Sequence, residues 1–175
     1  MTTRTKILAG TAVLLCVLVY PFEVIVAPEW DVSVVDENGK PLTGAYVLEF
    51  ANQGTLETHY EQAICSDKNG EAHFARQTVR ASVLTRISKF ISNFGPHSSF
   101  GPDVKMGAER LGYGDMANDV ATAEWSGGRS RVHSQFSLHK CPSGFTAYQC
   151  NSNYDYWFRI NGESAKKVAA CQSAQ

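Results

Sequence analysis

The stretch from Trp30 to Phe50, WDVSVVDENGKPLTGAYVLEF, constrains the fold most, because it places a turn signal between two short apolar runs. Asn38 and Gly39 suit the positive φ of a tight turn, and Pro41 holds φ near −65°. We expect a strand, a turn and a second strand. Their apolar side chains are expected to share one buried face: Val32, Val34, Ala45, Val47 and Phe50. Two strands cannot bury such a face alone, so the stretch predicts a β-sandwich.

Two turn motifs carry a family resemblance. The first, D-x-x-G-x-P-L-x-G-A-x-V, is filled by Asp36, Gly39, Pro41, Leu42, Gly44, Ala45 and Val47. The second, S-D-x-x-G-x-x-x-F, is filled by Ser66, Asp67, Gly70 and Phe74. Together they resemble the carboxypeptidase regulatory-like domain over about residues 30–75. The resemblance implies a mainly β fold, an Ig-like or prealbumin-like antiparallel β-sandwich, that acts as a non-catalytic binding module.

Further strands follow from alternation and turn signals. We expect them at Thr58–Cys65, at Ala72–Ala75 after the turn SDKNG, and at Arg131–Lys140. In the last of these, one set of side chains is predicted to face inward: Val132, Ser134, Phe136 and Leu138. The other set is predicted to face solvent: His133, Gln135, Ser137 and His139.

Residues 81–94 break this alternation and predict one amphipathic helix. Their apolar side chains recur with helical spacing and form a single stripe: Val83, Leu84, Ile87, Phe90, Ile91 and Phe94. We expect the helix to end near Gly95-Pro96 and to cover an open face or end of the sandwich. A helix that faces a partner or a membrane is the alternative.

The amino-terminal segment has the pattern of an export signal. Arg4 and Lys6 precede an uncharged run from Ile7 to Phe22. We predict an N-terminal transmembrane helix that acts as a signal anchor, with residues 1–27 as anchor and tether and 28–175 as an extracytoplasmic domain. In a bacterium this domain would lie on the periplasmic side of the inner membrane. Secretion after signal cleavage is the alternative.

The cysteines predict two disulfides in an oxidising compartment. Cys16 lies in the apolar segment, which leaves four in the globular part. Cys141 and Cys150 bracket a turn and are expected to pair, with Cys65 and Cys171 as the second pair. Free buried thiols and other connectivities remain open. The absence of C-x-x-C spacing disfavours a zinc cluster built from these cysteines.

Binding residues are expected in the loop GPHSSFGPD at residues 95–103, which supplies His97, Ser98, Ser99 and Phe100. Tyr156, in the aromatic run YDYWFRI, is a further candidate contact residue. A formal net charge of −1 excludes the strongly basic surface of a nucleic-acid-binding protein. No metal ligands or cofactor motif are predicted.

These features favour a membrane-tethered, extracytoplasmic binding or accessory domain without catalytic activity. We expect the membrane, through the N-terminal helix, and either another envelope protein or a cell-surface ligand as partners. A small envelope hydrolase that uses His97 with Ser98 or Ser99 is the alternative, although no G-x-S-x-G motif occurs in the chain.

Overall fold

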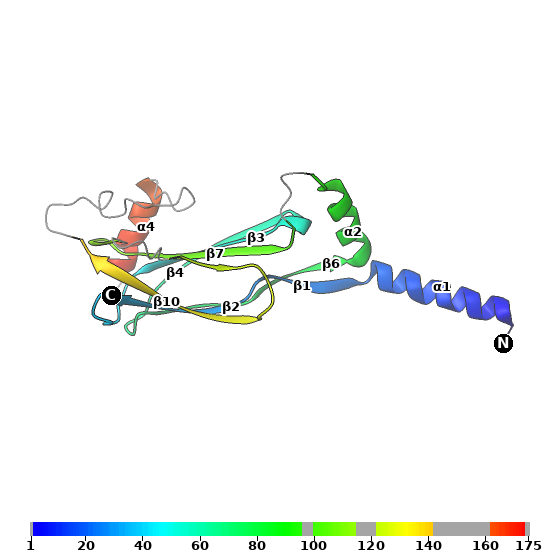
Figure 1. The fold of residues 1–175 in the computed structure, drawn as a ribbon, viewed down its shortest axis with the longest axis horizontal. Coiled ribbons are helices and arrows are strands. Elements are labelled where there is room, and N and C mark those ends of the chain that lie inside the picture. Colours follow the sequence, from blue (N-terminus) through cyan, green and yellow to red (C-terminus); the bar gives the residue numbers. More distant parts are fainter. Residues whose placement is uncertain (1, 96–99, 115–121, 142–161, 174–175) are drawn as a thin grey trace.

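The computed structural model describes residues 2–95, 100–114, 122–141 and 162–173 (Figure 1). Its helices are α1 (Thr3–Val19), η1 (Gly54–Leu56), α2 (Val83–Ser92) and α4 (Gly162–Ser173). Its strands are β1 (Pro21–Ala27), β2 (Glu29–Asp36), β3 (Tyr46–Gln53), β4 (Thr58–Cys65), β5 (Glu71–Phe74), β6 (Gln77–Ser82), β7 (Pro102–Glu109), β8 (Tyr113–Gly114), β9 (Thr122–Trp125) and β10 (Arg131–Lys140). The protein is therefore mainly β, as the sequence predicts.

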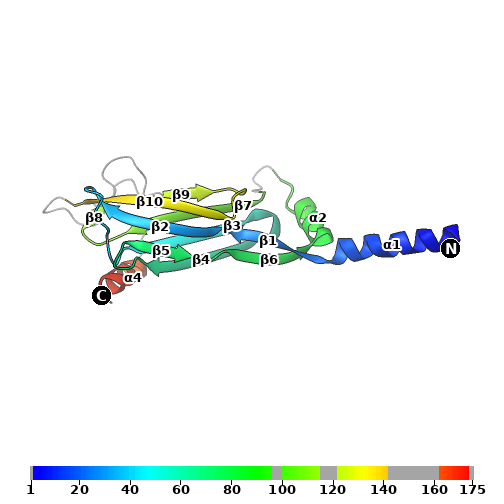
Figure 2. The same cartoon turned by 90° about the horizontal axis from the view of Figure 1, so that it is seen from below.

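Two four-stranded sheets face each other and enclose the core. One has the strand order β5-β2-β10-β8 and the other β4-β3-β7-β9. A two-stranded ribbon, β1-β6, continues the body toward α1, so that α1 and α2 lie at one end and α4 at the other (Figure 2). Trp30, Phe74 and Met106 are fully buried between the sheets. The layers are those of a β-sandwich.

The described strand pairs are antiparallel with one exception, because β10 runs parallel to β2. This parallel pair joins Glu29–Asp36 to Arg131–Lys140, which are about a hundred residues apart in the chain. A parallel pair needs a long crossover connection, and here most of the domain forms it. The predicted all-antiparallel pairing is therefore wrong for β2 and β10.

The strands around the turn at residues 37–45 do not pair with each other. β2 belongs to one sheet and β3 to the other, so the turn carries the chain across the sandwich. Val32 and Val47 are both buried and meet in the same core from opposite sides. The predicted strands and turn are confirmed. The apolar side chains of the two strands share one core because the strands lie in two facing sheets.

The inward face of β3 differs from the prediction at one position. Val47, Glu49 and Ala51 point into the core, whereas Phe50 is only partly buried. Side chains alternate along a strand, so a residue three positions after Val47 must face outward. The sequence grouping of Phe50 with Val47 was wrong, and a glutamate occupies the inward position.

The two D-x-x-G motifs form the same kind of turn. The Asp36 carboxylate accepts hydrogen bonds from the backbone N–H groups of Asn38 and Lys40 at 2.9 and 2.8 Å. Asp67 does the same for Asn69 and Glu71, at 2.8 and 2.9 Å. Asp side chains stabilise tight turns by accepting hydrogen bonds from backbone N–H groups a few residues later in the chain.

Several other predicted elements are confirmed. The strands at Thr58–Cys65 and Arg131–Lys140 have the predicted bounds, and β5 is shifted by one residue. Phe136 and Leu138 of β10 are buried while His133 is exposed, as alternation predicts. The helix predicted at 81–94 forms as α2. None of its side chains is buried, so the predicted covering of the sandwich by its apolar stripe is wrong.

The amino-terminal segment forms α1, a helix of 17 residues with no buried side chain. Among the described residues, no helix is both long and apolar enough to cross a membrane. The structure therefore does not support the predicted transmembrane helix. The expected tether is also not a linker, because Pro21–Ala27 forms β1 and pairs with β6. Val26 and Ala27 are buried in the core.

Candidate functional site

Most of the predicted binding loop lies outside the described residues. This holds for His97, Ser98 and Ser99, and also for Tyr156. Phe100 is described, and its ring lies 4.7 Å from that of Phe90 on α2 (centroid to centroid). The described part of the loop therefore contributes an aromatic side chain to the surface of α2.

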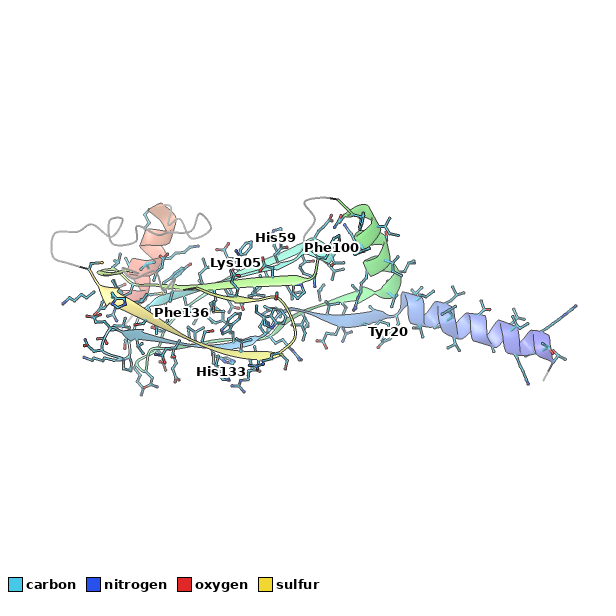
Figure 3. All side chains as sticks on the ribbon, viewed as in Figure 1. Tyr20, His59, Phe100, Lys105, His133 and Phe136 are labelled. Atoms are coloured by element: carbon cyan, nitrogen blue, oxygen red, sulfur yellow. A yellow bond between two sulfur atoms is a disulfide. The ribbon has the colours of Figure 1, made fainter. Side chains whose placement is uncertain are left out.

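An exposed apolar surface gathers where α1, β1 and α2 meet, and we call it the apolar end. Its residues are Val17 and Val19 from α1, Tyr20 between α1 and β1, Phe22 from β1, Leu84, Ile87, Phe90, Ile91 and Phe94 from α2 and the residues after it, and Phe100. Phe94 is 75% exposed and Ile91 68%. Figure 3 labels Tyr20 where α1 meets β1, and Phe100 beside α2. Apolar patches of this kind mark contact surfaces.

Polar contacts orient α2 so that its stripe faces away from the sandwich. The Ser82 hydroxyl caps the helix by accepting from the Thr85 N–H at 3.1 Å. Lys89 forms an ion pair with Glu57, next to η1, and holds the pKa of Glu57 below its usual value. Arg86 donates to the Phe22 carbonyl at 3.4 Å. The polar face thus contacts the body, and the apolar stripe remains exposed.

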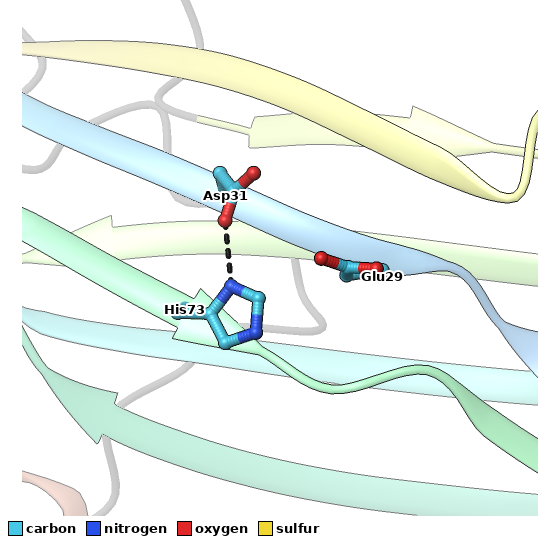
Figure 4. Close-up of side chains that lie close together, drawn as sticks. All are labelled: Glu29, Asp31 and His73. Atoms are coloured by element: carbon cyan, nitrogen blue, oxygen red, sulfur yellow. Dashed lines mark hydrogen bonds and ion pairs between the residues drawn. The ribbon is translucent and has the colours of Figure 1, made fainter.

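A row of three side chains crosses the outer face of the sheet β5-β2-β10. Asp31 on β2 is the register partner of His73 on β5 and of His133 on β10. Asp31 Oδ1 lies 2.6 Å from His73 Nδ1 (Figure 4), and Oδ2 lies 3.2 Å from His133 Nδ1. We call this the His-Asp-His row. Both imidazoles are more than half exposed.

Two further charges flank the row. Arg131 donates to Asp31 Oδ2 from Nε at 3.0 Å and from Nη2 at 2.9 Å. Its Nε also lies 3.4 Å from a carboxylate oxygen of Glu29. The hydrogen bond from His73, together with Arg131, lowers the pKa of Asp31 despite partial burial, so Asp31 is an anion at neutral pH.

Glu29, Asp31 and His73 form the group that could hold a metal ion among the described residues. One ligand atom from each lies within 4.8 Å of the others. Sequence reasoning missed this group because its members are 2 and 42 positions apart and no motif links them. Alternation does predict His133 on the solvent face of its strand, but only the pairing of β10 with β2 brings it to Asp31.

The disulfide Cys65–Cys171 is present, with 5.4 Å between the two Cα atoms. It joins the end of β4 to α4. Cys141 is also disulfide-bonded. Its predicted partner, Cys150, lies outside the described residues, so that pairing stays a prediction. Cys16 is free and exposed.

Two acids, the fully buried Glu49 and the partly buried Glu109, carry raised pKa values. Burial raises the pKa of Glu49 to about 7 and that of Glu109 to about 8. Both carboxylate oxygens of Glu49 are buried without a hydrogen-bond partner, and so is one oxygen of Glu109. Desolvation disfavours the charged form of a carboxyl group, so each holds its proton to a higher pH than an exposed acid.

Comparisons with known proteins find remote structural likenesses. No family model and no curated protein matches the chain. Catechol 1,2-dioxygenase from Pseudomonas arvilla C-1 is 15% identical with a TM-score of 0.42, over 66% of this chain and 53% of that one. A streptococcal ancillary pilin is 14% identical with a TM-score of 0.40, over 66% and 33%. A 3-chlorocatechol 1,2-dioxygenase from Rhodococcus opacus 1CP is 17% identical with a TM-score of 0.38, over 65% and 59%. Likenesses this remote carry no argument about function.

Proposed function

We propose that this chain is a membrane-attached, extracytoplasmic binding module whose prealbumin-like sandwich is related to carboxypeptidase regulatory-like domains. The observation that carries the proposal is the apolar end, where α1 and the exposed stripe of α2 lie together. The proposed occupant of this surface is a lipid bilayer.

The character of α1 supports lipid as the occupant. From Ile7 to Val19 nearly all of its side chains are apolar, with Leu8, Val13 and Leu14 each more than half exposed. A helix that is apolar all round needs an apolar environment on every side. Arg4 and Lys6 at its start are basic side chains, which favour contact with anionic lipid headgroups.

The position of α2 supports a second contact with the same bilayer. Figure 1 shows α1 continuing the long axis of the sandwich and α2 lying across that axis at the junction. A bilayer penetrated by α1 would therefore have α2 in the plane of its surface. Tyr20 and Phe22 lie at that level, and aromatic side chains favour the membrane interface. An amphipathic helix in this position buries its apolar face at the boundary between headgroups and acyl chains.

An extracytoplasmic location is supported by the disulfide between Cys65 and Cys171, because disulfides persist in oxidising compartments. The sheets then project away from the membrane. Their outer faces, which carry exposed polar side chains such as His73 and His133, are available for an envelope protein or a cell-surface ligand. We propose a role in binding and none in catalysis.

The membrane contact is tested with the full chain reconstituted into phosphatidylcholine and phosphatidylglycerol vesicles. An environment-sensitive fluorophore is placed on Ile91→Cys and, as a control, on Leu111→Cys, both in a Cys16→Ser background. Leu111 is an exposed apolar residue between β7 and β8. Its carbonyl accepts a hydrogen bond from Gln172 of α4, at the opposite end of the body from α2. We expect the protein to float with vesicles and only the probe at position 91 to shift to the blue.

The outcomes separate the two contacts. Protein that stays with the soluble fraction would overturn membrane attachment altogether. Flotation with identical spectra for the two probes would overturn the α2 contact. Labelling of Leu111→Cys by a membrane-impermeant maleimide in intact cells tests the compartment, and protection of that thiol until lysis would place the sandwich in the cytoplasm and overturn the proposal.

A further inference from the structure

We propose that Glu29, Asp31 and His73 bind a zinc ion. The ligands are an imidazole nitrogen of His73, a carboxylate oxygen of Asp31 and a carboxylate oxygen of Glu29. This inference does not depend on the proposed membrane attachment.

The donor types fit zinc. Imidazole nitrogen and carboxylate oxygen are standard zinc ligands, with bonds of about 2.0–2.2 Å. In a tetrahedral site such ligands lie roughly 3.3 Å apart. His73 Nδ1 and Asp31 Oδ1 are 2.6 Å apart and share a proton. For zinc to replace that proton, His73 Nδ1 and Asp31 Oδ1 must move apart by less than about 1 Å. The exposed His73 ring can make this movement by rotation.

The backbone prearranges the ligands. His73 and Asp31 lie on adjacent strands and in register, so they share one face of the sheet. Glu29 is two residues before Asp31 on β2 and points to the same face. Trp30 and Val32, on the opposite face of the same strand, are fully packed in the core and hold β2 in place. The fold therefore holds the ligand side chains close together before zinc binds.

The charge of the cluster also suits a cation. With neutral imidazoles, Glu29 and Asp31 contribute two negative charges and Arg131 one positive charge, which leaves one net negative charge. Arg131 is the competitor, since it binds Asp31 Oδ2 in a two-pronged ion pair. The Oδ1 atom of Asp31 is directed to His73 instead, and Arg131 is 56% exposed and can turn toward solvent. Arg131 therefore lowers the affinity for zinc without blocking the site.

Isothermal titration of the full chain in detergent micelles, with any affinity tag removed, measures the zinc stoichiometry and affinity. We expect one zinc ion per chain at this site. His73→Ala should weaken binding by at least about tenfold, and Arg131→Gln should tighten it. His59→Ala is the matched control, because His59 is an exposed histidine on β4 in the other sheet, and it should leave the affinity unchanged.

Zinc competes with protons for imidazole, so the affinity of the wild-type chain should also fall on acidification from pH 7.5 to about 6. Absence of measurable binding would overturn the site. Equal losses in His73→Ala and His59→Ala would show scattered surface binding and would overturn it as well. Circular dichroism confirms that each variant is folded, and His73→Gln, which keeps the volume but not the ligand, must reproduce the loss.

Discussion

Gly44 packs directly against the backbone of Cys171, so that a Cβ atom at position 44 would lie 2.9 Å from the Cys171 carbonyl oxygen. This contact links the turn between the two sheets to α4. The φ of Gly44 is +71°, in the left-handed region that favours glycine.

Gly44→Ala should therefore lower the free energy of unfolding by about 2–4 kcal/mol, from the left-handed φ and the clash together. Gly39→Ala is the matched control. Gly39 has a similar φ of +76°, but nothing lies within 4 Å of its would-be Cβ atom. Its cost should be limited to about 1–2 kcal/mol. Urea denaturation of both variants measures the difference. Equal losses of unfolding free energy would show that the contact with Cys171 does not contribute.

Loss of the Cys65–Cys171 disulfide should release α4 before the sandwich unfolds. The two cysteines are 106 residues apart, and loop-closure entropy alone gives an upper value of about 5 kcal/mol for the unfolded state. In Cys65→Ser/Cys171→Ser, amide hydrogen exchange should accelerate in α4 and much less in β3. Cys16→Ser should change nothing, because Cys16 is free and exposed. Unaltered exchange in α4 would mean that packing alone holds this helix.

The buried Glu49 should make the protein less stable as the pH rises. Its folded pKa is raised from 4.5 to about 7, so the folded state keeps a proton that the unfolded chain has already lost. The associated stability is fully present below about pH 4.5 and is lost as the pH rises through about 7, a total of about 3 kcal/mol.

Glu49→Gln should accordingly stabilise the protein at pH 8 and have little effect at pH 5. Glu61→Gln, an exposed acid on the neighbouring strand β4, is the control and should show no such dependence. Chemical denaturation at the two pH values measures both variants. A Glu49→Gln effect that is the same at pH 5 and pH 8 would contradict burial of an ionising group at this position.

Cys141 is disulfide-bonded, and Cys150 is its predicted partner. Peptide mapping under non-reducing conditions should yield one fragment that contains both residues and a second that joins Cys65 to Cys171. A fragment that links Cys141 to Cys16, or to a second copy of the chain, would refute the predicted pairing.

The local structure followed from the sequence where neighbouring residues decide it. The turns at Asp36 and Asp67 form because each carboxylate accepts from N–H groups a few positions ahead. Alternation was sufficient for the strand Arg131–Lys140, and helical spacing was sufficient for α2. The pairing of Cys65 with Cys171 was also predicted, because it is the one pair left among the four cysteines once Cys141 and Cys150 are expected to pair.

Only the tertiary structure decided what lies next to what. Strands pair through backbone groups that every sequence carries. No sequence motif therefore predicts that β10 pairs with β2 in parallel. That pairing brings His133 to Asp31, and the pairing of β5 with β2 brings His73 there, so the two together create the His-Asp-His row. The inward position of Glu49 likewise follows from the strand's alternation against a packed core, which overrides the polarity of the side chain.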